Sequence, residues 1–147
     1  MQIRSAETAG FCFGVERAVS LAEQTAKSCA SAVTLGPIIH NRHVVERFEA
    51  MGLREIARAE DAQPGQTVVI RAHGIPVSEQ QTLAARGAKL VDATCPFVKK
   101  IHVIARQAEE AGRHLLIIGT PTHPEVTAIA SYSSDAHVFQ TDRKSVV

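Results

Sequence analysis

The sequence of 147 residues has few aromatic side chains and no excess of charge of either sign. Tryptophan is absent and aromatic residues make up 4% of the chain, too few for a stacking surface that binds single-stranded nucleic acid. The 16 Lys and Arg residues nearly balance the 15 Asp and Glu residues, so the formal net charge is +1. Because binding a polyanion needs a basic excess, we expect neither nucleic acid nor an anionic membrane surface as a partner.

Long apolar runs are also missing. The best one, Leu115–Ile118 with its neighbours, is far shorter than the ~20 residues that cross a bilayer. The first residues, Met1–Glu7, lack the apolar core of a secretory signal. The chain has only three cysteines, an odd number that does not form a disulfide framework. These absences favour a cytoplasmic protein in a reducing compartment.

The composition that remains is that of an ordinary globular domain, with 45% hydrophobic and 21% charged residues. It excludes intrinsic disorder, and the length is enough for a hydrophobic core. Short β-branched runs alternate with amphipathic stretches, which predicts an α/β fold with a mainly parallel sheet. We expect strands at Ile3–Ser5, Val33–Leu35, Leu53–Ile56 (the weakest), Val68–Arg71, Lys89–Val91, Leu115–Ile118 and Ala136–Phe139. We expect helices at Val15–Cys29, Arg42–Met51, Val77–Arg86, Phe97–Ala111 and Glu125–Ser131.

Five expected helix entries each carry one cysteine or one histidine: Cys12, His40, His73, Cys95 and His123. In an open parallel sheet these connections share one edge, where ligands bind. Helix N-termini there present free N–H groups that favour thiolates and attract phosphate. Prolines directly follow two of the five residues and fit the first helical turn, which places Cys95 and His123 at helix caps.

Several chemistries fit this pattern. Two thiolates far apart in sequence, Cys12 and Cys95, suit a metal, but the absence of Cys-x-x-Cys disfavours a zinc ribbon or a thioredoxin-type site. Zinc with mixed ligands and an iron–sulfur cluster both stay open. Glu125, close to His123, is a candidate proton donor. We interpret the other cysteine and the other four histidines as structural: Cys29, His43, His102, His114 and His137.

Five segments resemble, in order, the motifs of the IspH/LytB family of 4-hydroxy-3-methylbut-2-enyl diphosphate reductases: Gly10-Phe11-Cys12-Phe13-Gly14-Val15-Glu16-Arg17-Ala18-Val19, Gly36-Pro37-Ile38-Ile39-His40-Asn41, Arg71-Ala72-His73-Gly74, Asp92-Ala93-Thr94-Cys95-Pro96 and His123-Pro124-Glu125-Val126. They cover nearly the whole chain, so the resemblance is specific. It implies the last step of the non-mevalonate isoprenoid pathway. In that step 4-hydroxy-3-methylbut-2-enyl diphosphate is converted to isopentenyl and dimethylallyl diphosphate by two-electron reductive dehydration.

The resemblance also implies a role for each junction residue. Cys12 and Cys95 would be two of three protein thiolates on a [4Fe–4S] cluster that receives electrons from a ferredoxin or a flavodoxin. The histidines would bind the substrate, with His40 and His73 facing the diphosphate and His123 nearer the hydroxyl-bearing end. Glu125 would supply the proton with which the hydroxyl leaves as water.

The family has three α/β units around the cluster and is about twice as long as this sequence. The resemblance therefore implies that residues 1–95 are a first unit and residues 96–141 the start of a second, truncated one. The third cluster cysteine is absent, so we expect an incomplete fragment with little or no activity alone. The last six residues, Asp142–Val147, are what GAT CGG AAG AGC GTC GTG encodes, a common sequencing-adapter string, so we expect residues 142–147 to be a non-native tail.

Two other interpretations stay open. The chain could be a non-catalytic diphosphate- or metal-binding module that uses the same cysteines and histidines. It could also be a thiol-redox protein in which Cys12 and Cys95 form a reversible disulfide.

Overall fold

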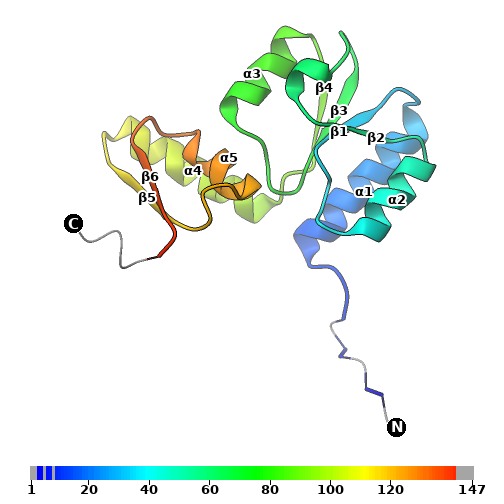
Figure 1. The fold of residues 1–147 in the computed structure, drawn as a ribbon, viewed down its shortest axis with the longest axis horizontal. Helices are drawn as coiled ribbons and strands as arrows, with labels where there is room; N and C mark the ends of the chain where they lie inside the picture. The colour runs from blue at the N-terminus through cyan, green and yellow to red at the C-terminus, as the bar shows by residue number, and fades with distance from the viewer. Residues whose placement is uncertain (1–2, 5, 8, 142–147) are drawn as a thin grey trace.

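The computed structural model describes residues 3–4, 6–7 and 9–141. Its helices and strands alternate along the chain (Figure 1). The order is α1 (Phe13–Ser28), β1 (Val33–Leu35), α2 (Arg42–Ala50), β2 (Arg54–Ile56), a 3-10 turn (Ala59–Asp61), β3 (Thr67–Ile70), α3 (Val77–Ala85), β4 (Lys89–Asp92), α4 (Pro96–Glu110), β5 (Leu115–Ile118), α5 (Pro124–Ala130) and β6 (Ala136–Phe139).

The strands form two separate parallel sheets. Four strands pair in the order β2-β1-β3-β4, and β5 pairs with β6. In the first sheet Leu35 lies opposite both Ile56 and Ile70, while in the second Ile118 lies opposite Phe139. All pairs are parallel, which confirms the predicted α/β class.

Helices cover the four-stranded sheet on both faces, as is usual for a parallel sheet. Successive residues of β3 point to opposite faces, so Val69 packs with Ala22 of α1 and Phe48 of α2. Its neighbour Val68 packs instead in the second core, with Leu35 of β1 and Leu83 of α3. Both faces of this sheet are therefore buried. The loops that follow the carboxyl ends of its strands lead into the next helices, and these loops are free to carry functional side chains.

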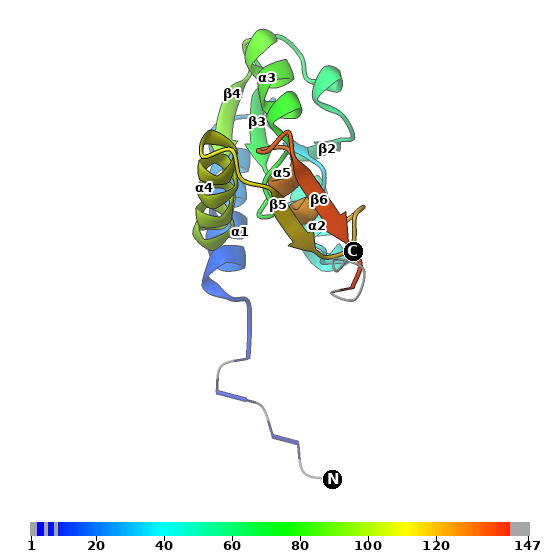
Figure 2. The same ribbon diagram turned by 90° about the vertical axis from the view of Figure 1, so that its left-hand side faces the viewer.

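Helix α4 leads from the first sheet to the second (Figures 1 and 2). The two parts are also joined by hydrogen bonds from α3 to the turn after α5. The Val77 amide donates to Ser131 Oγ at 3.0 Å, and Gln80 Nε2 donates to Tyr132 Oη at 2.8 Å. The side chains of Leu116 and Ile118 in β5 are 58% and 59% exposed, so the small sheet has an uncovered apolar face.

One predicted strand is wrong. Ile3 and Arg4 are not in a strand, while Ser5 lies outside the described residues. Ile3 is 81% exposed, so the described residues Ile3 and Arg4 have neither a neighbouring strand nor buried apolar surface to hold them. The predicted tail, residues 142–147, also lies outside the described residues. Within the described part of the chain, no helix is both long and apolar enough to cross a bilayer.

Candidate functional site

Three of the five junction residues are the N-cap residues of their helices: Cys12 of α1, Cys95 of α4 and His123 of α5. A proline follows Cys95 and His123 in the first turn, which confirms the predicted caps. His40 directly precedes Asn41, whose side chain accepts a hydrogen bond from the Val44 amide at 3.3 Å and caps α2. Backbone geometry at the helix starts therefore determines where these side chains emerge.

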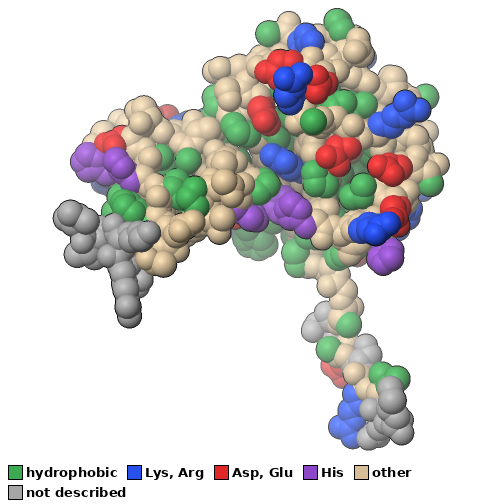
Figure 3. Space-filling model, in the orientation of Figure 1, with side chains coloured by type: hydrophobic (Ala, Val, Ile, Leu, Met, Phe, Trp, Pro, Cys, Tyr) green, Lys and Arg blue, Asp and Glu red, His purple; other side chains and the backbone are tan. Residues whose placement is uncertain are grey.

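The three junction histidines meet at one place. The ring centroid of His40 lies 4.7 Å from that of His73 and 6.2 Å from that of His123, and the other two are 5.6 Å apart. One ring nitrogen from each lies within 4.8 Å of the others. Figure 3 shows histidine side chains gathered where the two parts of the molecule meet. Because His123 Nδ1 accepts a hydrogen bond from the Glu125 amide at 3.2 Å, its Nε2 remains available to a ligand.

We call His40, His73 and His123 the imidazole cluster. In this cluster the surroundings of His73 disfavour its charged form. Burial, together with the positive charges of His40, His123 and Arg71, lowers the pKa of His73 to about 4. Its Nδ1 is buried and has no hydrogen-bond partner among the described residues. A buried polar atom without a partner is unfavourable, and a ligand that pairs with this nitrogen removes that penalty.

Arg71 connects the two loops that carry His40 and His73. Its Nε donates to the Gly74 carbonyl at 3.2 Å, and its guanidinium lies against Gly36. A Cβ at Gly36 would be 2.6 Å from Arg71 Nη1, and Gly36 has φ +69°. The positive φ favours glycine here, and because Gly36 has no Cβ the arginine can lie across the start of the loop.

Two of the three thiols are close to the start of α1. Cys12 is the exposed N-cap of that helix, and a Cβ placed on Gly14 would be only 2.4 Å from Cys95 Sγ. Arg17, one turn further along α1, donates to the Thr94 carbonyl at 3.2 Å and to the Asp92 carbonyl at 3.5 Å. The start of α1 is therefore held against the loop between β4 and α4.

Cys29 lies at the other end of α1, as its C-cap residue. Its thiol hydrogen-bonds with Thr67 Oγ1 at 3.5 Å and with Ser31 Oγ at 3.7 Å, and these contacts lower the pKa of Cys29. All three cysteines are free thiols. Among the described residues, no group of three side chains close enough to share a metal includes a cysteine.

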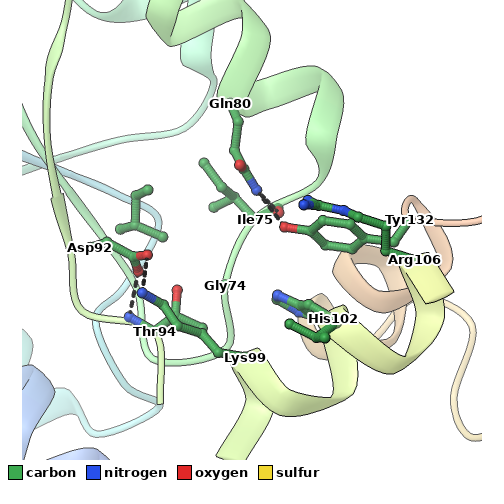
Figure 4. Close-up of a pocket in the computed structure, with 11 residues that line it drawn as sticks. Gly74, Ile75, Gln80, Asp92, Thr94, Lys99, His102, Arg106 and Tyr132 are labelled. Carbon is green, nitrogen blue, oxygen red and sulfur yellow. Dashed lines mark hydrogen bonds and ion pairs between the residues drawn. The ribbon is translucent and has the colours of Figure 1, made fainter. Parts of the chain in front are cut away.

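A cavity of about 190 Å³ lies behind the loops of the site (Figure 4). Its wall includes Gly74, which follows His73, and Thr94, which precedes Cys95, but none of the six candidate residues lines it. The polar residues of this wall are not among the site residues predicted from the sequence, where His102 is interpreted as structural. The sequence does contain a signal for this polar wall, because Lys99, His102 and Arg106 are spaced so that they share one face of α4.

The fold and the site define a class: a parallel α/β protein with an imidazole cluster and thiols at the carboxyl edge of its strands. Comparison with known families identifies the member of that class. The family model for the LytB protein matches residues 3–147, and this chain belongs to the LytB family, also called IspH.

Curated relatives and solved structures agree with this assignment. The chain is 39% identical over 146 residues to a 4-hydroxy-3-methylbut-2-enyl diphosphate reductase of Citrifermentans bemidjiense, covering 99% of the chain and 52% of the relative. It is 47% identical over 140 residues to the reductase of Oleidesulfovibrio alaskensis, covering 94% and 50%. The chain thus spans about half the length of the curated relatives it matches.

Two solved structures have the same fold over most of this chain. A structure of (E)-4-hydroxy-3-methyl-but-2-enyl diphosphate reductase, described as the terminal enzyme of the non-mevalonate pathway, matches with a TM-score of 0.81 and 41% identity, covering 95% of this chain and 51% of that one. The reductase from Plasmodium falciparum matches with a TM-score of 0.86 and 27% identity, covering 93% and 44%.

Proposed function

We propose that this chain forms part of the active site of a 4-hydroxy-3-methylbut-2-enyl diphosphate reductase. The reaction is the two-electron reductive dehydration of that substrate to isopentenyl and dimethylallyl diphosphate. The observation that carries the proposal is the imidazole cluster, in which His40, His73 and His123 converge from three separate loops. These loops belong to motifs by which the sequence resembles the reductases, and the histidines supply donors for an anionic substrate.

In this proposal His40 and His73 bind the diphosphate, and His123 lies nearer the hydroxyl-bearing end. The buried Nδ1 of His73 lacks a partner, and a phosphate oxygen provides one when that nitrogen carries a proton. Phosphate charge also offsets the repulsion that His40, His123 and Arg71 exert on a protonated His73. Substrate binding therefore raises the pKa of His73 and recruits it as a charged donor.

Glu125 acts as the proton donor to the leaving hydroxyl. It is in the first turn of α5, and its amide is bonded to His123. The acid and the histidine nearest the hydroxyl are therefore held on one short stretch of backbone. Such positioning is what general acid catalysis requires.

Cys12 and Cys95 would hold the [4Fe–4S] cluster. The close approach of Cys95 Sγ to Gly14, two residues after Cys12, fits a group bound by both thiols, and when bound the cluster supplies electrons and a Lewis-acidic iron. Cys29 lies at the far end of α1 and does not fit as a third ligand. We therefore propose that residues 1–95 and 96–141 are the first unit and part of the second unit of a three-unit fold, with little or no turnover by this chain alone.

Anaerobic reconstitution with iron and sulfide tests the assignment of the thiols. A brown protein with iron and sulfide approaching about four of each per chain is expected. Iron content should fall sharply in Cys12→Ser and Cys95→Ser and stay unchanged in Cys29→Ser, which serves as the matched control. Equal loss in all three variants, or none in any, would contradict the assignment. Substrate-dependent oxidation of a reduced dye then measures turnover, with a ferredoxin or a flavodoxin as the proposed physiological donor.

A second candidate, a metal-binding module without catalysis, is favoured by the spacing of the ring nitrogens, which lie within 4.8 Å of one another. Zinc binds imidazole nitrogen at about 2.0–2.1 Å, so small ring movements would close the site. A colourless protein that holds stoichiometric zinc, lost in His73→Ala and retained in Cys12→Ser, would favour this module over the reductase.

A further inference from the structure

The cavity behind the site has a polar lining that the proposed reaction does not use. We call it the α4 pocket and define it by Asp92, Thr94, Lys99, His102, Arg106 and Tyr132. It lies between α3, β4 and α4, where the two parts of the molecule meet, and Tyr132 closes one side of it (Figure 4). Its volume is about 190 Å³, below the ~300 Å³ at which drug-sized ligand sites begin. The pocket therefore suits a small ligand.

His102 is the buried polar group of the pocket. The residue is only 7% exposed, and its ring stacks on Tyr132 with 4.7 Å between centroids. The ring also lies against Gly74, where a Cβ would be 2.6 Å from His102 Cε1. His102 Nε2 is buried and has no hydrogen-bond partner among the described residues. Burial lowers the pKa of His102, so the ring is neutral at physiological pH and a single ligand atom satisfies the nitrogen.

Arg106 supplies an uncompensated positive charge. Its guanidinium carbon lies 5.2 Å from the centroid of the Tyr132 ring, and within the described residues no carboxylate forms an ion pair with it. The only acid of the lining, Asp92, already accepts from Lys99 Nζ at 2.6 Å and from the Thr94 amide at 2.9 Å. The lining therefore carries a net positive charge, with its one carboxylate occupied.

The tyrosine adds one more donor. Because Tyr132 Oη accepts a hydrogen bond from Gln80 Nε2, its own hydrogen is free to be donated. The guanidinium, this hydroxyl and the unpartnered imidazole nitrogen form a set in which donors outnumber acceptors. Such a set binds an oxyanion, and arginine in particular matches the geometry of phosphate.

We propose that the α4 pocket is a second ligand site, which binds a small phosphate-class oxyanion through Arg106, Tyr132 and His102. The ligand would touch Gly74 and Thr94, the chain neighbours of His73 and Cys95. The site does not depend on the proposed reductase function, because none of its side chains belongs to the imidazole cluster or to the two proposed cluster thiols.

NMR titration of the ¹⁵N-labelled chain with inorganic phosphate tests the proposal. The side-chain amide of Gln80 and the backbone amide of Tyr132 should shift in a saturable manner at millimolar phosphate. Arg106→Met should weaken this binding by roughly tenfold or more, because a charge-assisted hydrogen bond is lost. Arg113→Met removes an exposed arginine just beyond α4 and should leave it unchanged. Glycerol phosphate, run in parallel, distinguishes a site for free phosphate from one for phosphate esters.

The outcomes separate this proposal from the function proposed above. In His40→Asn, phosphate binding to the imidazole cluster is weakened while the shifts of Gln80 and Tyr132 persist. Unmoved signals from these two residues, or equal affinity in Arg106→Met and the parent chain, would overturn the pocket and leave the reductase proposal standing. His102→Gln offers a second test: a thermal melt first establishes that this variant folds, and a folded variant with undiminished affinity also counts against the site.

Discussion

Replacement of Gly14 by alanine should destabilise the protein, although alanine is the better helix former. Gly14 is in the first turn of α1 and is buried. Its missing Cβ is what admits Cys95 Sγ, which would lie 2.4 Å from the added carbon, with Cys95 Cβ at 3.1 Å. Real Cβ atoms do not approach other atoms within 3.0 Å, so either the thiol rotates away or the starts of α1 and α4 move apart.

The two effects can be weighed against each other. Exchanging glycine for alanine inside a helix contributes up to about 1 kcal/mol of stability, and less in the first turn. Overpacking a buried contact costs about 1–3 kcal/mol. The clash therefore outweighs the gain in helix propensity, and we expect a net loss of about 1–2 kcal/mol in the free energy of unfolding. With a typical urea slope, the midpoint falls by roughly 0.5–1 M.

Urea denaturation followed by circular dichroism measures this loss. Ser20→Ala, at an exposed position of α1, is the control for helix propensity and should be neutral or slightly stabilising. Cys95→Ala removes the atom nearest to the added carbon, so Gly14→Ala should cost less in that background than in the parent chain. A Gly14→Ala variant as stable as the parent, or a loss unaffected by Cys95→Ala, would refute the packing of α1 against the loop before α4.

Four further outcomes follow from the site and its surroundings. The pKa of His73 is about 4 in the folded protein against an ordinary 6.5, so between these pH values only the unfolded state gains the proton. Up to about 3 kcal/mol of stability is therefore lost as the pH falls through this range. Chemical denaturation at several pH values should show a shallower loss of stability in His73→Asn. An NMR titration of the His73 ring should give a higher pKa with inorganic pyrophosphate present than without it, and an unchanged value would exclude a nearby anion. Asn41→Ala removes the cap of α2 and should lower the unfolding free energy by about 1 kcal/mol. Tyr132→Phe removes the hydrogen bond with Gln80 and should lower it by about 0.5–1.5 kcal/mol. Thermal denaturation measures both losses.

Local signals in the sequence predicted much of this fold. The bounds of β5 and β6 match the predicted strands, because each is a short β-branched or apolar run between polar turns. The prolines after Cys95 and His123 marked the starts of α4 and α5, since proline fits only the first helical turn. The meeting of His40 and His73 was predictable too, because parallel strands bring the loops at their carboxyl ends to one edge. His123 follows β5 of the second sheet, so its approach to the other two depends on how the two sheets pack.

Features that depend on contacts between distant segments could not be predicted. Nothing local distinguishes one six-stranded sheet from the observed division into four and two strands, because strand pairing is decided by packing. Gly14 is two residues from Cys12 in the sequence, yet the side chain for which it makes room is that of Cys95, 81 positions away. His102 reads as a core residue by its spacing, and only the folded chain shows that Tyr132 and Gly74 lie against it.

The direction of the strands also determines where the molecule can be altered without harm. All strands of the first sheet run parallel, so the turns that lead into them gather at the amino edge, opposite the imidazole cluster. Gln63, Pro64 and Gly65, in the turn before β3, are exposed. An affinity tag or fluorescent reporter inserted there would have the length of the strands between it and the histidines. Exposed turns of this kind accept insertions most readily, which makes this one a suitable attachment point for immobilising or labelling the protein.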